Sequence, residues 1–122
     1  MQRTRILLVA VIAVLALTVG GTQASAAKIK GTLVGNVGPG FTITLKQKGK
    51  TVKTLKRGIY RINVSDNSGI HNFHLFGPGV NKKTGVSSSG GASWMVNMKK
   101  GKYTFRCDSH FRSGMIGKFK VK

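Results

Sequence analysis

A single cysteine lies close to a histidine and a methionine near the end of this 122-residue chain. In the stretch RCDSHFRSGM, Cys107 is followed three residues later by His110 and, five residues beyond that, by Met115. A thiolate, an imidazole and a thioether are soft or borderline metal donors, and one loop of this size can bring all three to a point. The sequence holds no second cysteine, so a metal ligand, a reactive thiol or an intermolecular disulfide are the roles open to Cys107.

The upstream stretch GIHNFHLFGPG supplies the candidates for a fourth donor. His71 and His74 are three residues apart, so on a β-strand they project from opposite faces and cannot easily serve one ion together. We favour His71, because it shares its face with Phe73 and Leu75, which we expect to be buried. His74 is then expected to be a packed or surface histidine.

The expected donor set of one thiolate, two imidazoles and one thioether discriminates between metals. A Cys-His-His plane with a weak axial methionine is the blue-copper electron-transfer site. Zinc would accept the cysteine and both histidines, but it gains little from a thioether. Met115 therefore favours copper over zinc.

The chain from residue 27 onward predicts a β-sandwich that would hold these residues. Short apolar–polar alternations recur between clusters of Gly, Pro, Asn and Ser, and we find no convincing helical periodicity. In the second alternation, Phe41, Ile43 and Leu45 share one face. About seven short strands in some 96 residues indicate one all-β domain, an antiparallel sandwich or barrel. We expect the turn-rich stretch 77–93 to be a long connection, and strands at 28–36, 41–47, 58–66, 70–76, 93–99, 102–107 and 117–122.

The first 26 residues have the pattern of a secretory signal peptide. Two arginines precede the uncharged apolar run 6–19, and Ala24-Ser25-Ala26 forms an A-x-A cleavage site. The run is shorter than the roughly 20 residues that cross a bilayer, which favours cleavage over a retained membrane anchor. We therefore expect a signal peptide at 1–26 and an exported domain at 27–122, in the periplasm, outside the cell or at its surface.

The chain is strongly basic, with 21 Lys and Arg against two acidic residues and a formal net charge of +19. Two of the basic residues lie in the predicted signal peptide, so the exported domain carries 19 against two, or +17. The electrostatic field of this charge attracts polyanions and acidic protein surfaces over roughly 8–10 Å. For an exported chain without a nucleic-acid-binding motif, we expect an acidic redox protein, an anionic membrane or a cell-wall surface rather than nucleic acid.

The two motifs together resemble the cupredoxins, the small blue-copper proteins, and within them the plastocyanin/amicyanin branch. That branch shows the C-x2-H-x4-M spacing that Cys107, His110 and Met115 reproduce, and its upstream ligand segment is similar to HNFH, whose first residue is His71. The resemblance implies a monomeric, single-domain Greek-key β-sandwich. It also implies one copper ion, cycling between Cu(I) and Cu(II), that is held by these four residues.

The resemblance further implies roles around the ligands. Asn72 would lie beside the sulfur and tie the two ligand loops together, with Asp108 as the acceptor of that tie. His110 would be the imidazole nearer the surface, where electrons enter or leave. We expect a docking patch and surrounding lysines there, the patch being formed by Phe111, Phe76, Pro78 and Gly38 to Gly40.

The function that the resemblance implies is the transfer of single electrons, not catalysis. Four protein ligands leave no open position for a substrate, and the H-x-H pairs of multicopper oxidases do not occur in the sequence. Two alternatives stay open: a copper carrier or store that uses the same ligands, and a non-redox domain whose charge binds anionic surfaces. Arg112 in the ligand loop differs from the acidic patches of plant plastocyanins, so no photosynthetic partner is implied.

Overall fold

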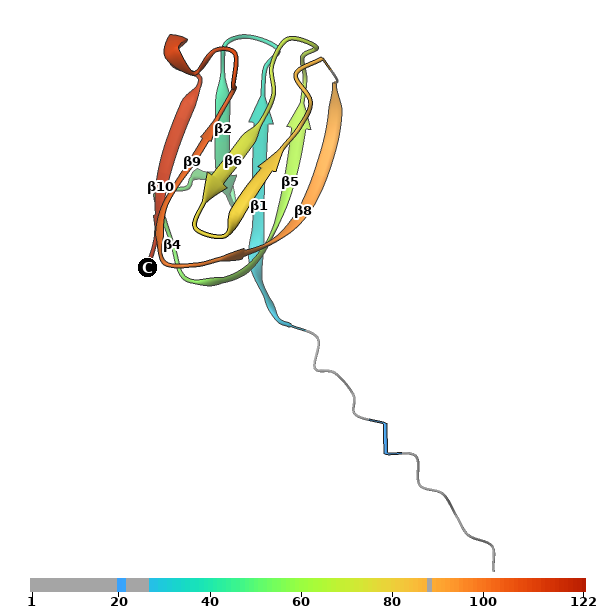
Figure 1. The fold of residues 1–122 in the computed structure, drawn as a ribbon, viewed down its shortest axis with the longest axis vertical. Coiled ribbons are helices and arrows are strands. Elements are labelled where there is room, and N and C mark those ends of the chain that lie inside the picture. The colour runs from blue at the N-terminus through green and yellow to red at the C-terminus, as the bar shows by residue number, and fades with distance from the viewer. Residues whose placement is uncertain (1–19, 22–26, 88) are drawn as a thin grey trace, which may run out of the picture.

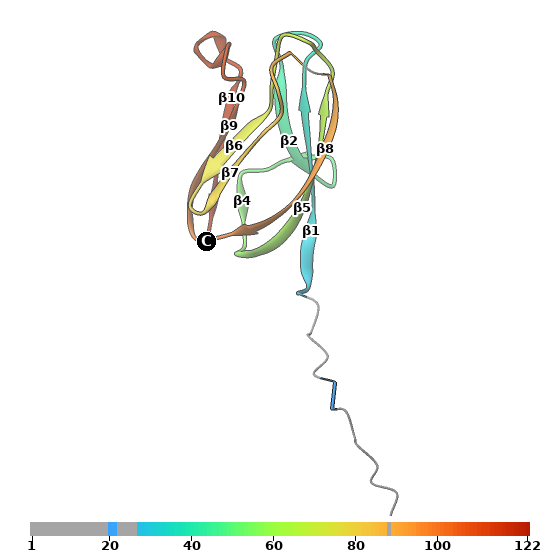
Figure 2. The ribbon, with the colours of Figure 1, turned by 45° about the vertical axis from the view of Figure 1, so that its right-hand side comes forward.

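The computed structural model describes residues 20–21, 27–87 and 89–122. The predicted signal peptide therefore lies outside the described residues, apart from Gly20 and Gly21, and its cleavage stays a prediction. In the part of the chain that is described, no helix is both long and apolar enough to cross a membrane. Two five-stranded β-sheets pack face to face as one all-β domain, as Figure 1 and Figure 2 show from two directions.

The first sheet has the strand order β3-β2-β1-β5-β8. Its strands are β1 (Ile29–Val37), β2 (Ile43–Gln47), β3 (Lys50–Thr51), β5 (Gly58–Asp66) and β8 (Gly90–Met98). The central pair β1 and β5 is parallel, and the other pairs are antiparallel. The predicted antiparallel sandwich therefore contains one parallel pair in this sheet, because β3 and β4 carry the chain across the sandwich and back between β2 and β5.

The second sheet has the order β4-β10-β9-β6-β7. Its strands are β4 (Thr54–Leu55), β6 (His74–Gly77), β7 (Val80–Lys83), β9 (Gly101–Arg106) and β10 (Ile116–Val121). Again one edge pair, β4 with β10, is parallel. The single turn of 3-10 helix η1 (Phe111–Ser113) lies in the connection between β9 and β10.

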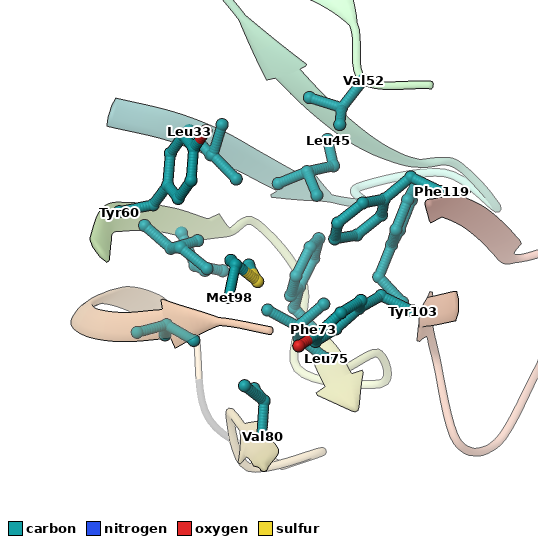
Figure 3. Packing of buried hydrophobic residues seen from close by; sticks show 14 of the residues in the cluster. Leu33, Leu45, Val52, Tyr60, Phe73, Leu75, Val80, Met98, Tyr103 and Phe119 are labelled. Carbon is teal, nitrogen blue, oxygen red and sulfur yellow. The ribbon is translucent and has the colours of Figure 1, made fainter. Parts of the chain in front are cut away.

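The core between the sheets follows the predicted alternation. Along β5, Tyr60, Ile62 and Val64 are buried while the residues between them are exposed. Aromatic rings fill the middle, where the Phe73 and Phe105 rings stack with centroids 5.7 Å apart. Figure 3 shows side chains from both sheets meeting there, including Leu33, Leu45, Phe73, Tyr103 and Phe119.

Two predictions about local structure are wrong. The stretch 77–93 is not an irregular connection, since it holds β7 and the start of β8, and Pro78-Gly79 turns β6 back into β7 as a hairpin. The strand expected at 70–76 begins only at His74. Residues 71–73 precede it, and all three are buried, so the argument from opposite strand faces does not apply to them.

The strand register gives the domain two distinct ends. The upper end, at the top of Figure 1, consists of the connections 37–43, 66–74, 83–90 and 106–116. The lower end consists of the start of β1, the end of β10 and the turns 55–58, 77–80 and 98–101. Tyr103 helps to hold the lower end together, because its buried hydroxyl accepts from Lys99 N at 2.9 Å and faces the Pro78 oxygen at 2.8 Å.

A substitution at Gly117 tests the packing of the second sheet. Gly117 lies opposite Phe105 across β9 and β10, and the Phe105 ring occupies the position that an added Cβ would take. Because the ring is buried, we expect Gly117→Ala to lower the free energy of unfolding by about 1–3 kcal/mol. Urea denaturation measures this loss. A Cβ at exposed Gly40 meets nothing within 4 Å, so Gly40→Ala is the control, and equal midpoints for both variants would contradict the packing.

Candidate metal centre

Three of the predicted ligands meet at the upper end of the sandwich. His71 lies in the connection between β5 and β6, Cys107 follows β9 directly, and His110 precedes η1. Their donor atoms lie within 4.8 Å of one another. The two Nδ1 atoms of His71 and His110 are 3.0 Å apart, and Cys107 Sγ lies 3.7 Å and 3.5 Å from them, respectively. His71 and Cys107 are fully buried, whereas His110 is partly exposed.

The spacing of these donors fits a single transition-metal ion. In the plane of the three atoms, one point lies about 2.0 Å from each of them, close to metal–nitrogen bonds of about 2.0–2.1 Å and metal–sulfur bonds of about 2.3 Å. Two imidazoles that face each other through Nδ1 need a proton or a cation between them. His71 Nε2 is buried without a hydrogen-bond partner among the described residues, so His71 is directed to the cluster through Nδ1 alone.

Met115 closes the loop that carries Cys107 and His110. Cys107 N donates to the Met115 oxygen at 3.0 Å, and Met115 N donates to the His110 oxygen at 3.3 Å. Gly114, at φ 97°, makes the left-handed step that this closure requires. The Met115 side chain is fully buried beside the fully buried cysteine. Its role as an axial ligand stays a prediction.

Asn72 and Asp108 join the two loops that carry the donors. The buried Asn72 amide donates from Nδ2 to Asp108 Oδ2 at 2.9 Å, and its Oδ1 accepts from Asp108 N at 2.8 Å. Because these residues directly follow His71 and Cys107, the pair of hydrogen bonds fixes the spacing of the imidazole and the thiolate. This is the tie that the resemblance implied.

Asp108 is held in its ionised form by its neighbours. Its carboxylate also faces His74 Nδ1 at 2.8 Å and Arg106 Nε at 3.1 Å. Partial burial raises the pKa of this carboxyl, but the hydrogen bonds that it accepts outweigh burial and lower the pKa to about 2. The carboxylate therefore remains an acceptor for Asn72 throughout the physiological range of pH.

The structure places His74 outside the three-donor cluster. One ring nitrogen faces Asp108, and the other lies 2.6 Å from the side-chain oxygen of Asn81 on β7. Both nitrogens are thus hydrogen-bonded away from Cys107. The choice of His71 over His74 agrees with this geometry, although the reason is the buried connection at 71–73 and not the alternation of a strand.

Sequence reasoning missed a second tie, made by Asp66 and Thr84. Thr84 Oγ1 donates to the buried Asp66 carboxylate at 2.9 Å and accepts from Phe73 N at 2.9 Å. This links the end of β5 to the chain just after His71 and Asn72. The sequence does single out Asp66, because it is one of only two acidic residues. Its partner Thr84, however, lies in the stretch 77–93, for which we expect an irregular connection.

Phe41 is the other residue that sequence reasoning misplaced. The sequence groups it on one strand face with Ile43 and Leu45, yet it precedes β2 and is 58% exposed. Its ring makes edge contacts with both imidazoles, at 5.1 Å from His71 and 4.9 Å from His110 between centroids. Phe41 therefore covers the two histidines from the solvent side.

The docking patch expected around His110 needs one correction. Pro78 lies at the lower end, where it packs on Gly101, and so it cannot belong to the patch. The surrounding lysines stay a prediction, and the basic residues of the connection 106–116 itself are Arg106 and Arg112. Both guanidinium groups lie over the Phe111 ring, at 4.2 Å and 5.6 Å, respectively, from its centroid.

Comparison with known proteins supports the fold. No protein-family model matches the sequence, and no curated protein matches it. Rusticyanin from Thiobacillus ferrooxidans is 23% identical with a TM-score of 0.54, over 79% of this chain and 86% of that one. Another structure, of the copper protein rusticyanin, is 21% identical over 75% and 76% of the two chains, also with a TM-score of 0.54. A multi-copper oxidase from Pediococcus acidilactici is 15% identical with a TM-score of 0.52, over 82% of this chain but only 28% of the oxidase.

These similarities define the class of structure. The chain has a cupredoxin-like fold, as the sequence resemblance predicted, and its described residues form a single β-sandwich domain. A His-Cys-His cluster lies at the upper end of that fold, next to a buried methionine. This combination is consistent with a blue-copper site.

The tie between the loops can be tested without metal. Asn72→Ala leaves the Asp108 N–H and the Thr84 oxygen without the Asn72 partner, so we expect metal-free protein to lose about 1–3 kcal/mol of unfolding free energy. Urea denaturation provides the measurement. Asn97 is exposed on β8, and Asn97→Ala should change stability by less than about 0.5 kcal/mol. Equal losses in the two variants would show that the tie carries no special stability.

Proposed function

We propose that the protein is a small exported carrier of single electrons that holds one copper ion at the His71, Cys107 and His110 cluster. The observation that carries this proposal is the convergence of two imidazole nitrogens and one sulfur, 3.0–3.7 Å apart, at the end of a cupredoxin-like sandwich. Copper supplies a one-electron couple that soft sulfur and imidazole donors stabilise in both oxidation states. The basic start and apolar run of the sequence support export to the periplasm or the cell surface.

Each residue of the cluster contributes differently. Cys107 contributes a buried thiolate, and His71 contributes a buried imidazole whose position is set by the Asn72–Asp108 tie. Partly exposed His110 provides the route to the surface, under the exposed ring of Phe41. Met115 serves as the weak axial donor in this proposal.

The surroundings of the cluster favour electron transfer over catalysis. Buried donors on two hydrogen-bonded loops change position little when the charge at the centre changes, and a small rearrangement favours fast electron exchange. Burial of Cys107 and Met115 also excludes water from the sulfur side. The redox partner in this proposal is a protein whose acidic surface approaches the arginines around Phe111.

Titration of purified metal-free protein with Cu(II) tests the function. We expect one equivalent to produce an intense blue colour that a reductant bleaches and an oxidant restores, because a thiolate bound to Cu(II) absorbs strongly. Metal held without this colour would replace the electron carrier by a copper carrier or store. Failure to bind copper would leave a non-redox domain.

The ligand assignment is tested by two matched substitutions. His71→Ala removes a nitrogen that lies within 3.7 Å of Cys107 Sγ, so we expect the blue colour to be lost. His74→Ala removes a ring that faces Asp108 and Asn81 instead, so the colour should persist. Visible absorption with Cu(II) measures both variants, and circular dichroism checks that each is folded. The opposite result would make His74 the ligand.

A further inference from the structure

The positive charge of the domain is concentrated at the end opposite the candidate metal centre. Ten of the 19 basic residues that follow residue 26 lie at or next to the lower end, and all ten are exposed. We call this set the basic end. It consists of Lys28, Lys30, Lys53, Lys56, Arg57, Lys99, Lys100, Lys102, Lys120 and Lys122.

No acidic side chain balances the basic end. The sequence has only two acidic residues, and Asp66 and Asp108 both lie at the upper end. There they serve as hydrogen-bond acceptors for Thr84, Asn72 and other groups. The domain is therefore polarised along its length, because ten of its 17 excess positive charges lie at the end away from the cluster.

The basic residues come from several turns and strands, and six of them line shared grooves. Lys102 and Lys120, which are partners across β9 and β10, line two adjoining grooves. One groove, of about 440 Å³, also includes Lys53, and the other, of about 400 Å³, includes Arg57 and Lys122. Lysines on both sides of a shallow groove can bind separate phosphate groups in several positions, because they impose no single geometry.

The composition of this surface distinguishes among anionic partners. Arg57 is the only arginine of the ten, whereas protein interfaces are enriched in arginine and aromatic residues and depleted in lysine. Among the described residues of the lower end no aromatic ring is exposed, and Tyr103 and Phe119 are buried, so bases of single-stranded nucleic acid have nothing to stack on. A lysine-rich surface without aromatic anchors fits anionic lipid headgroups.

We propose that the basic end docks on the surface of an anionic phospholipid bilayer, with the upper end and its metal cluster pointing away from the lipid. The proposal concerns a surface remote from the cluster and does not depend on copper binding. Docking in this orientation leaves His110 and Phe41 free to meet a redox partner.

The test is co-sedimentation of the full chain with two kinds of vesicle. One is made of neutral phosphatidylcholine, and the other also contains anionic phosphatidylglycerol. In the full chain the apolar run 6–19 contributes to binding of both kinds of vesicle. A difference in binding between the two therefore measures the contribution of the charged surface. We expect tighter binding to the anionic vesicles, and we expect added salt to abolish the difference.

Two triple variants with the same change in net charge locate the surface. Lys53→Gln, Lys102→Gln and Lys120→Gln together remove three charges from the basic end. At about five-fold per lysine, they should weaken binding to anionic vesicles on the order of 100-fold. Lys82→Gln, Lys83→Gln and Arg112→Gln remove three exposed charges outside the basic end and should weaken binding far less. Thermal unfolding verifies that both variants are folded.

Two results would overturn the proposal. Equal losses in both triple variants would mean that net charge, not the basic end, determines attraction to the vesicles. Binding that is no tighter to anionic than to neutral vesicles would contradict docking on lipid. If soluble inorganic polyphosphate then bound tightly, and the first triple variant lost that binding, the surface would be assigned to a phosphate polymer instead.

Discussion

The upper end of this domain depends on one buried pair of hydrogen bonds, between the Asn72 amide and Asp108. The two residues lie on connections from different parts of the sequence, and each directly follows a predicted metal ligand. A buried amide without partners would be costly, so both loops are stable only when they lie together. The ionised carboxylate strengthens the bond to Nδ2. The imidazole of His71 and the sulfur of Cys107 therefore approach each other through protein–protein contacts, and a metal ion would enter a site that is already arranged.

The same carboxylates explain the distribution of charge. With only two acidic residues available, both are placed where a buried or partly buried network needs a strong acceptor, Asp108 between the ligand loops and Asp66 at Thr84. No acidic residue is left for the rest of the surface, so its charged side chains are all basic. The uneven distribution of charge is thus linked to the metal centre. The carboxylates of Asp66 and Asp108 accept hydrogen bonds at the upper end and cannot neutralise basic residues at the lower end.

Much of this could be predicted from the sequence, for physical reasons that differ between regions. Period-2 alternation along β5 and β8 reflects one buried and one solvated face, so both strands could be predicted, β5 with its observed bounds and β8 from residue 93 although it begins at Gly90. Cys107, His110 and Met115 lie within one short loop, so their spacing could be recognised from the sequence alone. The position of His71 beside them depends on packing between loops that are distant in sequence. The β6–β7 hairpin was misread because Pro78-Gly79 reverses the chain within a stretch whose composition is typical of an irregular connection. Phe41 was misread because its strand begins only at Ile43.

The aromatic core connects the two ends of the molecule. Phe73 follows Asn72 directly and stacks on Phe105, two residues before Cys107. From there the contacts continue through Phe119, at 6.5 Å between centroids, to Tyr103, which stacks on it at 5.3 Å and bonds the backbone of the lower end through its hydroxyl. Close-packed rings in a protein interior do not deform independently of one another. A surface that held the lower end would consequently fix the direction in which the metal centre faces, since the core between them transmits orientation as one rigid body.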